Sequence, residues 1–234
     1  MSGSYWEIDY EIELLSDFHT GDGTMLAGGN VHALRRDVDG FPFIFRDEVR
    51  GLLRAAAIDT LKKSEVIKDR EVLFNKCFGN KEEDSNKQGK KSLWNISSAR
   101  YLHEIRSRFQ NLPAWPDLEE RGFVVSQSHI KMGSDNVVER LFTIQKAGGR
   151  EAAHRRLEGV IYSRKTATLR DAAFMVAALR AGDRVGLRKD RGYGKVRFSV
   201  KSVRSYFKPD SAQTDNRGLD DWIDVLLTKQ EDSK

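Results

Sequence analysis

Glycines lie among cations in the stretch from Ala181 to Val203, AGDRVGLRKDRGYGKVRFSVKSV, and this combination could bind a polyanion. Glycine lets the backbone approach a ligand closely, and cations beside free backbone N–H groups make an anion site. The stretch therefore predicts contact with a sugar-phosphate polymer or with an acidic partner. The residues expected to take part are Arg188, Lys189, Arg191, Gly192, Tyr193 and Lys195. Tyr193 could stack on a base or pack on the sheet, and we favour packing.

Motifs for several other chemistries are missing from the sequence. No cluster of His and Cys has the spacing of zinc ligands, and Gly194-Lys195 lacks the upstream glycines and the Ser/Thr of a P-loop. The one cysteine, Cys77, lies between apolar residues. We therefore expect it to be a small buried side chain rather than a catalytic thiol.

The first part of the chain predicts a strand, a loop and a helix. Residues 6–14 alternate apolar and acidic side chains, which indicates a strand whose acidic face meets solvent or another protein. Glycines between Gly21 and Gly29 predict a long flexible loop, and residues 37–40 predict a turn. Asp47 is expected to be the N-cap of a helix that runs to Leu61, with arginines on one face at Arg50 and Arg54.

The remaining elements complete a mixed fold. Strands are expected over 93–102, 157–162 and 196–200, and Phe123–Ala147 predicts two extended segments about a turn. Asp171–Ala181 predicts a helix with a buried apolar face and with Gly182 as its C′ glycine, and 218–229 predicts a last helix. The order strand, helix, strand, insertion, strand, helix, strand is that of an α+β, ferredoxin-like (RRM-like) fold.

Composition narrows the class of partner. The chain has 234 residues and a formal net charge of +5, which favours nucleic acid, a membrane surface or an acidic protein as partner. The acidic N-terminal stretch does not resemble a signal peptide, and no apolar run approaches the length of a membrane helix. We expect a soluble, cytoplasmic protein without a membrane partner.

Four motifs, taken together and in this order, resemble the RAMP superfamily of CRISPR-associated proteins, and most closely its Cas-seven group. They are SDFHTGDG, RDVDGFPFIFRDEVRGLLR, FNKCFGN and GLRKDRGYGKVRF. The second matches the family's helix-start segment at Gly40, Pro42, Ile44, Arg50, Gly51 and Arg54. The fourth matches the family's C-terminal glycine loop at Gly186, Arg191, Gly192, Gly194 and Val196. The resemblance covers most of the chain.

The resemblance implies a repeated backbone subunit of a type III effector complex that binds guide RNA (crRNA) and, through it, complementary target RNA. It implies one domain, with a palm over about 5–122 and 155–206, a β-hairpin thumb over about 123–154 and a C-terminal extension over 207–234. Adjacent backbone subunits and other Cas subunits are the expected protein partners. Besides the glycine-loop residues, the expected RNA contacts are His19, Arg46, Arg50, Arg54, His129, Lys131 and Met132.

The sequence departs from the family at two places. The small and hydroxyl residues that contact guide phosphates before the helix are replaced by Arg46, Asp47 and Glu48, and carboxylates there repel phosphate. Active relatives cut target RNA with a loop aspartate and a divalent metal, but Asn30 and Val31 stand near that position. Asp22 is the acid inside the loop, so it is the candidate catalytic residue and Mg²⁺ ligand.

Three functions therefore stay open. The first is a guide-binding subunit, either non-cleaving or cleaving target RNA through Asp22 with Mg²⁺; we favour the non-cleaving form. The second is a metal-independent crRNA-processing endoribonuclease that uses His19 or His32 as general acid or base. The third is a non-catalytic protein scaffold whose basic loop meets an acidic partner.

Overall fold

The computed structural model describes residues 4–26, 31–63, 67, 69–79, 91–108, 122–132, 138–148, 152–185, 193–207 and 212–227. One sheet contains β1 (Tyr5–Leu14), β4 (Trp94–Ile96), β5 (Arg100–Tyr101), β8 (Arg156–Ser163), β9 (Val196–Tyr206) and β10 (Ala212–Asp215). A second sheet contains β2 (Gly21–Leu26), β3 (Val31–Leu34), β6 (Val124–Met132) and β7 (Val138–Ala147). The helices are α1 (Arg46–Lys63), α2 (Arg70–Phe78), α3 (His103–Arg108), α5 (Leu169–Ala181) and α6 (Leu219–Leu227), with the short 3-10 helix η1 (Ala152–Arg155).

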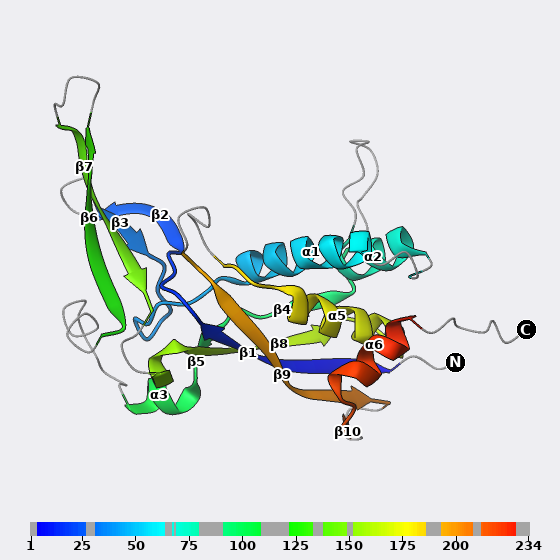
Figure 1. Cartoon of the computed structure of the whole chain (residues 1–234). Coiled ribbons are helices and arrows are strands. Elements are labelled where there is room, and N and C mark those ends of the chain that lie inside the picture. The colour runs from blue at the N-terminus through cyan, green and yellow to red at the C-terminus, as the bar shows by residue number, and fades with distance from the viewer. Residues whose placement is uncertain are drawn as a thin grey trace, which may run out of the picture.

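The first sheet has the strand order β10-β9-β1-β8-β4, β5 also pairs with β8, and these pairings are antiparallel. Along the chain the elements follow as β1, α1, β4, β8, α5 and β9, which is the predicted alternation of strands and helices with an insertion before β8. Figure 1 shows α1 and α5 on one side of this sheet, with the second sheet projecting beyond the start of α1. The α+β class predicted from the sequence is confirmed.

The core lies between the first sheet and its helices. Alternate side chains of β1 point into it, and Ile8, Tyr10 and Ile12 have no exposed surface. The Tyr10 ring packs against Phe198 of β9 at a centroid distance of 5.9 Å. The predicted apolar face of α5 is confirmed, because its members Phe174, Met175, Ala178 and Leu179 are all fully buried. Among the described residues no helix is long and apolar enough to cross a membrane.

The acidic face of β1 is neutralised within the sheet. Arg204 of β9 pairs with Glu7 and lies 2.6 Å from Asp9, while Lys201 lies 3.1 Å from Glu11. Arg197, at the end of the predicted cation-rich stretch, lies 3.2 Å from Glu13. The stripe that the sequence assigned to solvent or to a protein thus has its charge largely compensated by its neighbouring strand.

The predicted flexible loop over Gly21–Gly29 is wrong for the described part of that range. β2 pairs antiparallel with β3, and β3 pairs in parallel with β7, where Val31 lies opposite Thr143. Glycine lowers the intrinsic strand preference of this segment, but pairing partners from elsewhere in the chain supply the hydrogen bonds. The two extended segments predicted over Phe123–Ala147 are confirmed as the antiparallel pair β6 and β7.

Three local predictions are corrected or confirmed by the structure. Helix α1 begins at Arg46, so Asp47 lies in its first turn and is not its N-cap. Gly182 does follow α5, but its φ is −73°, which any residue can adopt. A Cβ there would lie 2.6 Å from Leu52 of α1, so close packing rather than a left-handed turn requires this glycine. Cys77 is fully buried, and burial raises the pKa of its thiol to about 12.

Candidate nucleic-acid interface

The two sheets meet at the segment that follows β1. Phe18 exchanges two backbone hydrogen bonds with Ala147 of β7, at 2.7 and 2.9 Å. Two residues later, the Thr20 hydroxyl donates to the Phe43 carbonyl at 3.0 Å, just before α1 begins. The start of α1 is therefore held against the junction of the sheets, as its position in Figure 1 also shows.

A cluster of arginines and phenylalanines surrounds the start of α1, and we call Arg35, Phe43, Phe45, Arg46 and Arg100 the α1 cluster. The Arg35 and Arg46 guanidinium carbons lie 4.6 and 5.7 Å from the Phe45 ring centroid. The Phe43 ring packs edge-on against Phe45, and Arg100 of β5 lies 5.8 Å from the Phe43 centroid. Aromatic rings and guanidinium planes stack on unpaired bases, and guanidinium groups also pair with phosphates.

The backbone at the start of α1 is less suited to an anion than the cluster beside it. The backbone N–H of Arg46 donates to the Ser98 hydroxyl at 3.1 Å, so this donor is already used. Asp47 and Glu48 place two carboxylates in the first turn. The Arg46 guanidinium, whose side chain is 61 % exposed, is the group at this position that can meet a phosphate.

Arg50 and Arg54, the other predicted contacts on α1, both have partners inside the molecule. Arg50 Nη2 donates to the Phe78 carbonyl at 2.7 Å, and the Arg54 guanidinium lies over the Phe74 ring at 5.3 Å. Both partners belong to α2. These contacts favour a role for the two arginines in packing α1 on α2, and their role as RNA contacts stays a prediction.

Backbone hydrogen bonds join the two ends of the predicted glycine loop, and we call the residues at these ends, Val185 and Tyr193–Lys195, the neck. Val185 donates its N–H to the Gly194 carbonyl at 2.7 Å, and Gly194 donates to the Asp17 carbonyl at 2.8 Å. Lys195 is exposed, and its backbone N–H donates to the Ser16 hydroxyl at 2.9 Å. The loop residues Arg188, Lys189, Arg191 and Gly192 lie outside the described residues.

Tyr193 packs within the neck. The ammonium group of Lys146 on β7 lies 3.9 Å from the Tyr193 ring centroid and donates a hydrogen bond to its hydroxyl. This geometry favours packing of the Tyr193 ring over stacking of the ring on a base. The contact also places the neck at the junction of the two sheets, near the segment that holds the start of α1.

His19 lies inside the junction. It is 5 % exposed, and its Nδ1 lies 2.7 Å from the carbonyl oxygen of Gln145, so this nitrogen is the protonated donor. Gln145 is itself buried and accepts from the Leu34 N–H through its side chain. This setting favours a structural role for His19 over the predicted RNA contact or general acid.

Replacing His19 with alanine should destabilise the fold by about 1–3 kcal/mol, because the buried Gln145 carbonyl loses its donor. Urea unfolding of the variant measures this loss. His103→Ala, which removes an exposed histidine on α3, should change the unfolding free energy far less. A His19→Ala protein of unchanged stability that has lost an RNA-cutting activity would support the processing endoribonuclease instead.

The candidate catalytic residues lie mostly outside the described residues. These are the side chains of Asp22 and His32 and the whole of Asn30; the thumb residues His129, Lys131 and Met132 have their backbones in β6 but no described side chains. Within the described part of the chain, no three His, Cys, Asp or Glu side chains come together as metal ligands. The described residues therefore offer no ready Mg²⁺ site.

Asp37 is a turn residue, as its sequence context predicts. Its Oδ1 accepts from the N–H groups of Asp39 and Phe41, both at 3.0 Å. Both Asp37 and Asp39 also pair with Arg106 of α3. These contacts fix the turn that leads into the α1 cluster.

Sequence reasoning missed most of the α1 cluster. The run Phe41–Phe45 is apolar throughout, and its first four residues are buried. Phe45 is partly exposed beside two arginines, Arg35 after β3 and Arg46 at the start of α1. The signal that could have found it is the pair Arg35-Arg36 upstream of the alternating phenylalanines.

Comparison with known proteins supports this description of the fold. A family model described as the RAMP superfamily matches residues 11–197. A chain from a cryo-EM structure of the type III-B Cmr-beta bound to cognate target RNA aligns with a TM-score of 0.57 and 10 % identity, covering 83 % of this chain and 96 % of that one. A chain from the apo state of type III-B Cmr-beta aligns with a TM-score of 0.56 and 14 % identity, covering 83 % and 97 %. No curated protein matches the sequence.

Proposed function

The chain belongs to the RAMP superfamily, and from this premise we propose that it is a crRNA-binding backbone subunit of a type III CRISPR effector complex. The likeness in fold to Cmr-beta chains supports this proposal. In the proposed role the protein binds single-stranded guide RNA and presents it to complementary target RNA. Its neighbours in the complex are further copies of such a subunit and other Cas proteins.

The α1 cluster is the observation that carries the proposal. The Arg35 and Arg46 guanidinium carbons lie 4.6 and 5.7 Å from the Phe45 ring centroid, and Phe45 remains partly exposed. Single-stranded RNA is bound through bases that stack on aromatic rings and phosphates that pair with cations, and this cluster offers both groups side by side. An acidic protein partner would pair with the cations, but its binding would not require the partly exposed Phe45 ring beside them.

The neck of the glycine loop lies at the junction of the two sheets, against which the start of α1 is also held. Lys195 is exposed beside Gly194, and Lys146 and Tyr193 join the neck to β7. Arg188, Lys189 and Arg191 of the glycine loop are proposed to contact phosphates of the same RNA. The net charge of +5 suits a polyanionic ligand.

RNA content and salt dependence test the proposal. The complex purified with this chain should retain a mature RNA of defined length. The logarithm of the affinity of the protein for RNA should fall linearly with the logarithm of the salt concentration. The slope should be about −0.7 for each phosphate neutralised on a single strand. A purified complex that carries no RNA would contradict both the guide-binding and the RNA-processing functions, and would favour the scaffold.

We expect binding without cleavage. Asn30 and Val31 stand near the position of the acid in active relatives, and an amide does not supply the negative charge that a hard cation favours. A complementary RNA incubated with the complex and Mg²⁺ should therefore stay intact. Cleavage that EDTA and Asp22→Ala both abolish would overturn this expectation and identify Asp22 as the metal ligand.

A further inference from the structure

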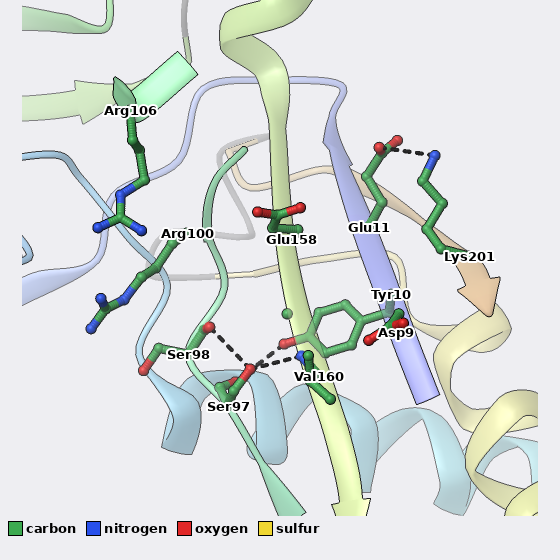
Figure 2. A pocket seen from close by; sticks show the side chains of 11 residues that line it. Asp9, Tyr10, Glu11, Ser97, Ser98, Arg100, Arg106, Glu158, Val160 and Lys201 are labelled. Carbon is green, nitrogen blue, oxygen red and sulfur yellow. Dashed lines mark hydrogen bonds and ion pairs between the residues drawn. The ribbon is translucent and has the colours of Figure 1, made fainter. Parts of the chain in front are cut away.

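A cavity of about 670 Å³ opens on the face of the first sheet that α1 and α5 leave uncovered (Figure 2). Its floor is the paired backbone of β1 and β8 around Tyr10, Gly159 and Val160. The Tyr10 ring lies across Gly159, where a Cβ would come within 2.3 Å of its hydroxyl oxygen. Sites for small molecules span roughly 300–1,000 Å³, so a ligand the size of a nucleotide fits this volume.

A β-bulge joins the cavity to the α1 cluster. Arg100 lies four positions after Ile96, whereas their partners Glu158 and Ile161 are three positions apart, so one extra residue lies between β4 and β5. Within the bulge the Ser97 hydroxyl accepts from Val160 N–H at 2.8 Å, and the Ser98 hydroxyl accepts from Arg46 N–H at 3.1 Å. Bulges of this kind commonly re-aim side chains beside functional sites.

Most of the charges that line the cavity are already paired. Lys201 lies 3.1 Å from Glu11, Asp9 lies 2.6 Å from Arg204, and Arg106 contacts the carboxylates of the Asp37 turn. Two further lining residues of opposite charge, Arg100 and Glu158, take no part in these ion pairs.

Arg100 and Glu158 lie directly opposite each other in register, but no ion pair within the described residues joins them. The Arg100 guanidinium lies instead over the Phe43 ring at 5.8 Å, and Glu158 Oε1 accepts from the His103 N–H at 3.1 Å. Figure 2 shows the Arg100 side chain directed away from Glu158, and both residues line the cavity. A carboxylate and a guanidinium therefore face the cavity from separate positions.

This arrangement selects among ligand charges. A cationic group could satisfy Glu158, but it would meet Arg100, Arg106 and Lys201. A simple anion could satisfy Arg100, but it would meet Glu158, Glu11 and Asp9. A ligand that suits both Glu158 and Arg100 has neutral hydrogen-bond donors for the Glu158 carboxylate and a separate anionic group for the Arg100 guanidinium.

Guanine nucleotides have this combination. The Watson–Crick edge of guanine carries two adjacent donors, N1–H and the 2-amino group, which a carboxylate can accept together. Adenine and cytosine each place one amino donor beside a ring-nitrogen acceptor, and uracil places its single N–H between two carbonyl acceptors. A carboxylate repels those acceptors, so it discriminates against these three bases.

We propose that this cavity binds a guanine nucleotide, with Glu158 accepting from the guanine edge and Arg100 contacting the phosphate. The nucleotide is either free or an unstacked base of RNA that lies over the α1 cluster, and the second case rests on the proposed function. Ser98 and Arg100 belong both to the cavity lining and to the contacts around the start of α1, so RNA could reach the cavity directly.

Titration of the purified chain with GMP, IMP, AMP, CMP and UMP tests this proposal. GMP should bind most tightly, and IMP, which lacks only the 2-amino group, should bind several-fold more weakly. Glu158→Gln should reduce the preference for GMP by about tenfold or more, since a bidentate contact carries that discrimination. Glu71→Gln, an equal charge change on the exposed face of α2, should leave it unchanged.

Arg100→Ala provides a second, independent variant. It should weaken all five nucleotides by a similar factor while GMP stays preferred, because the phosphate is common to them. Equal binding of the five nucleotides to the wild-type chain, or a GMP preference that survives in folded Glu158→Gln, would overturn the proposal.

The assembled complex separates the two sources of the base. Substitution of inosine for individual guanosines in the bound RNA should weaken RNA retention at the position that enters the cavity, and Glu158→Gln should remove that effect. GMP selectivity without any such position assigns the cavity to a free nucleotide. A complex that carries no RNA contradicts the proposed function, while GMP selectivity of the isolated chain still decides the cavity's ligand.

Discussion

Replacement of both Arg35 and Arg46 by alanine should release most of the RNA that the wild-type protein retains. Each guanidinium lies over Phe45 and can contact one phosphate of a strand stacked there. The salt slope should become shallower by about 0.7 for each cation removed, and affinity near physiological salt should fall on the order of tenfold to a hundredfold. A filter-binding or anisotropy titration at several salt concentrations measures both quantities.

Arg164→Ala is the matched control for this pair of substitutions. Arg164 is exposed just past the end of β8, and its guanidinium donates one 3.4 Å hydrogen bond to Asn95. The Arg164→Ala substitution should leave the RNA affinity and its salt slope close to those of the wild-type protein. A double variant of Arg35 and Arg46 that keeps the wild-type slope would place the RNA on another surface.

Gly194→Ala should lower the free energy of unfolding more than alanine at any other described glycine. Gly194 has φ of +70°, and a Cβ there would lie 1.8 Å from the backbone oxygen of Val185. The left-handed backbone costs about 1–2 kcal/mol for a residue with a side chain. Relief of the overlap must also break the hydrogen bonds that close the neck, at about 1 kcal/mol each, so we expect a total loss of about 2–4 kcal/mol. Thermal or urea unfolding measures it.

Gly51→Ala is the control for this substitution. Gly51 is exposed on α1 and nothing lies within 4 Å of a Cβ there, so alanine should stabilise the helix by about 0.5–1 kcal/mol. Folded Gly194→Ala protein should also bind RNA more weakly, because the neck sets where the glycine loop leaves the fold. If the variant is as stable as Gly51→Ala, the neck described here is wrong.

Elements with a strong local pattern were predictable from the sequence. The strict alternation of β1 and the apolar face of α5 arise from side chains that must all be buried on one side, so periodicity alone reveals them. The turn at Asp37 was predictable for a similar reason, because its carboxylate bonds to its own backbone neighbours. The order of these elements was enough to predict the α+β class.

Features made by contacts between distant segments were not predictable. β2 is a strand because it pairs with β3, and β3 also pairs with β7, more than a hundred residues away in the sequence. The α1 cluster joins Arg35, Phe45 and Arg100 from three separate parts of the chain, and nothing in the run around Phe45 marks it as the partly exposed ring. Arg50 and Arg54 look free in the sequence, but the packing of α2 gives both of them partners.

Photo-crosslinking of RNA to the purified complex, followed by mass spectrometry of the peptides, tests the central claim most directly. We predict RNA adducts on the peptide that contains Phe43, Phe45 and Arg46, together with adducts on the glycine-loop peptide that follows Val185. Both sets should disappear when Arg35 and Arg46 are replaced by alanine, while the protein stays folded. Adducts confined to other peptides, or a complex that yields no RNA adduct on this chain, would contradict the account.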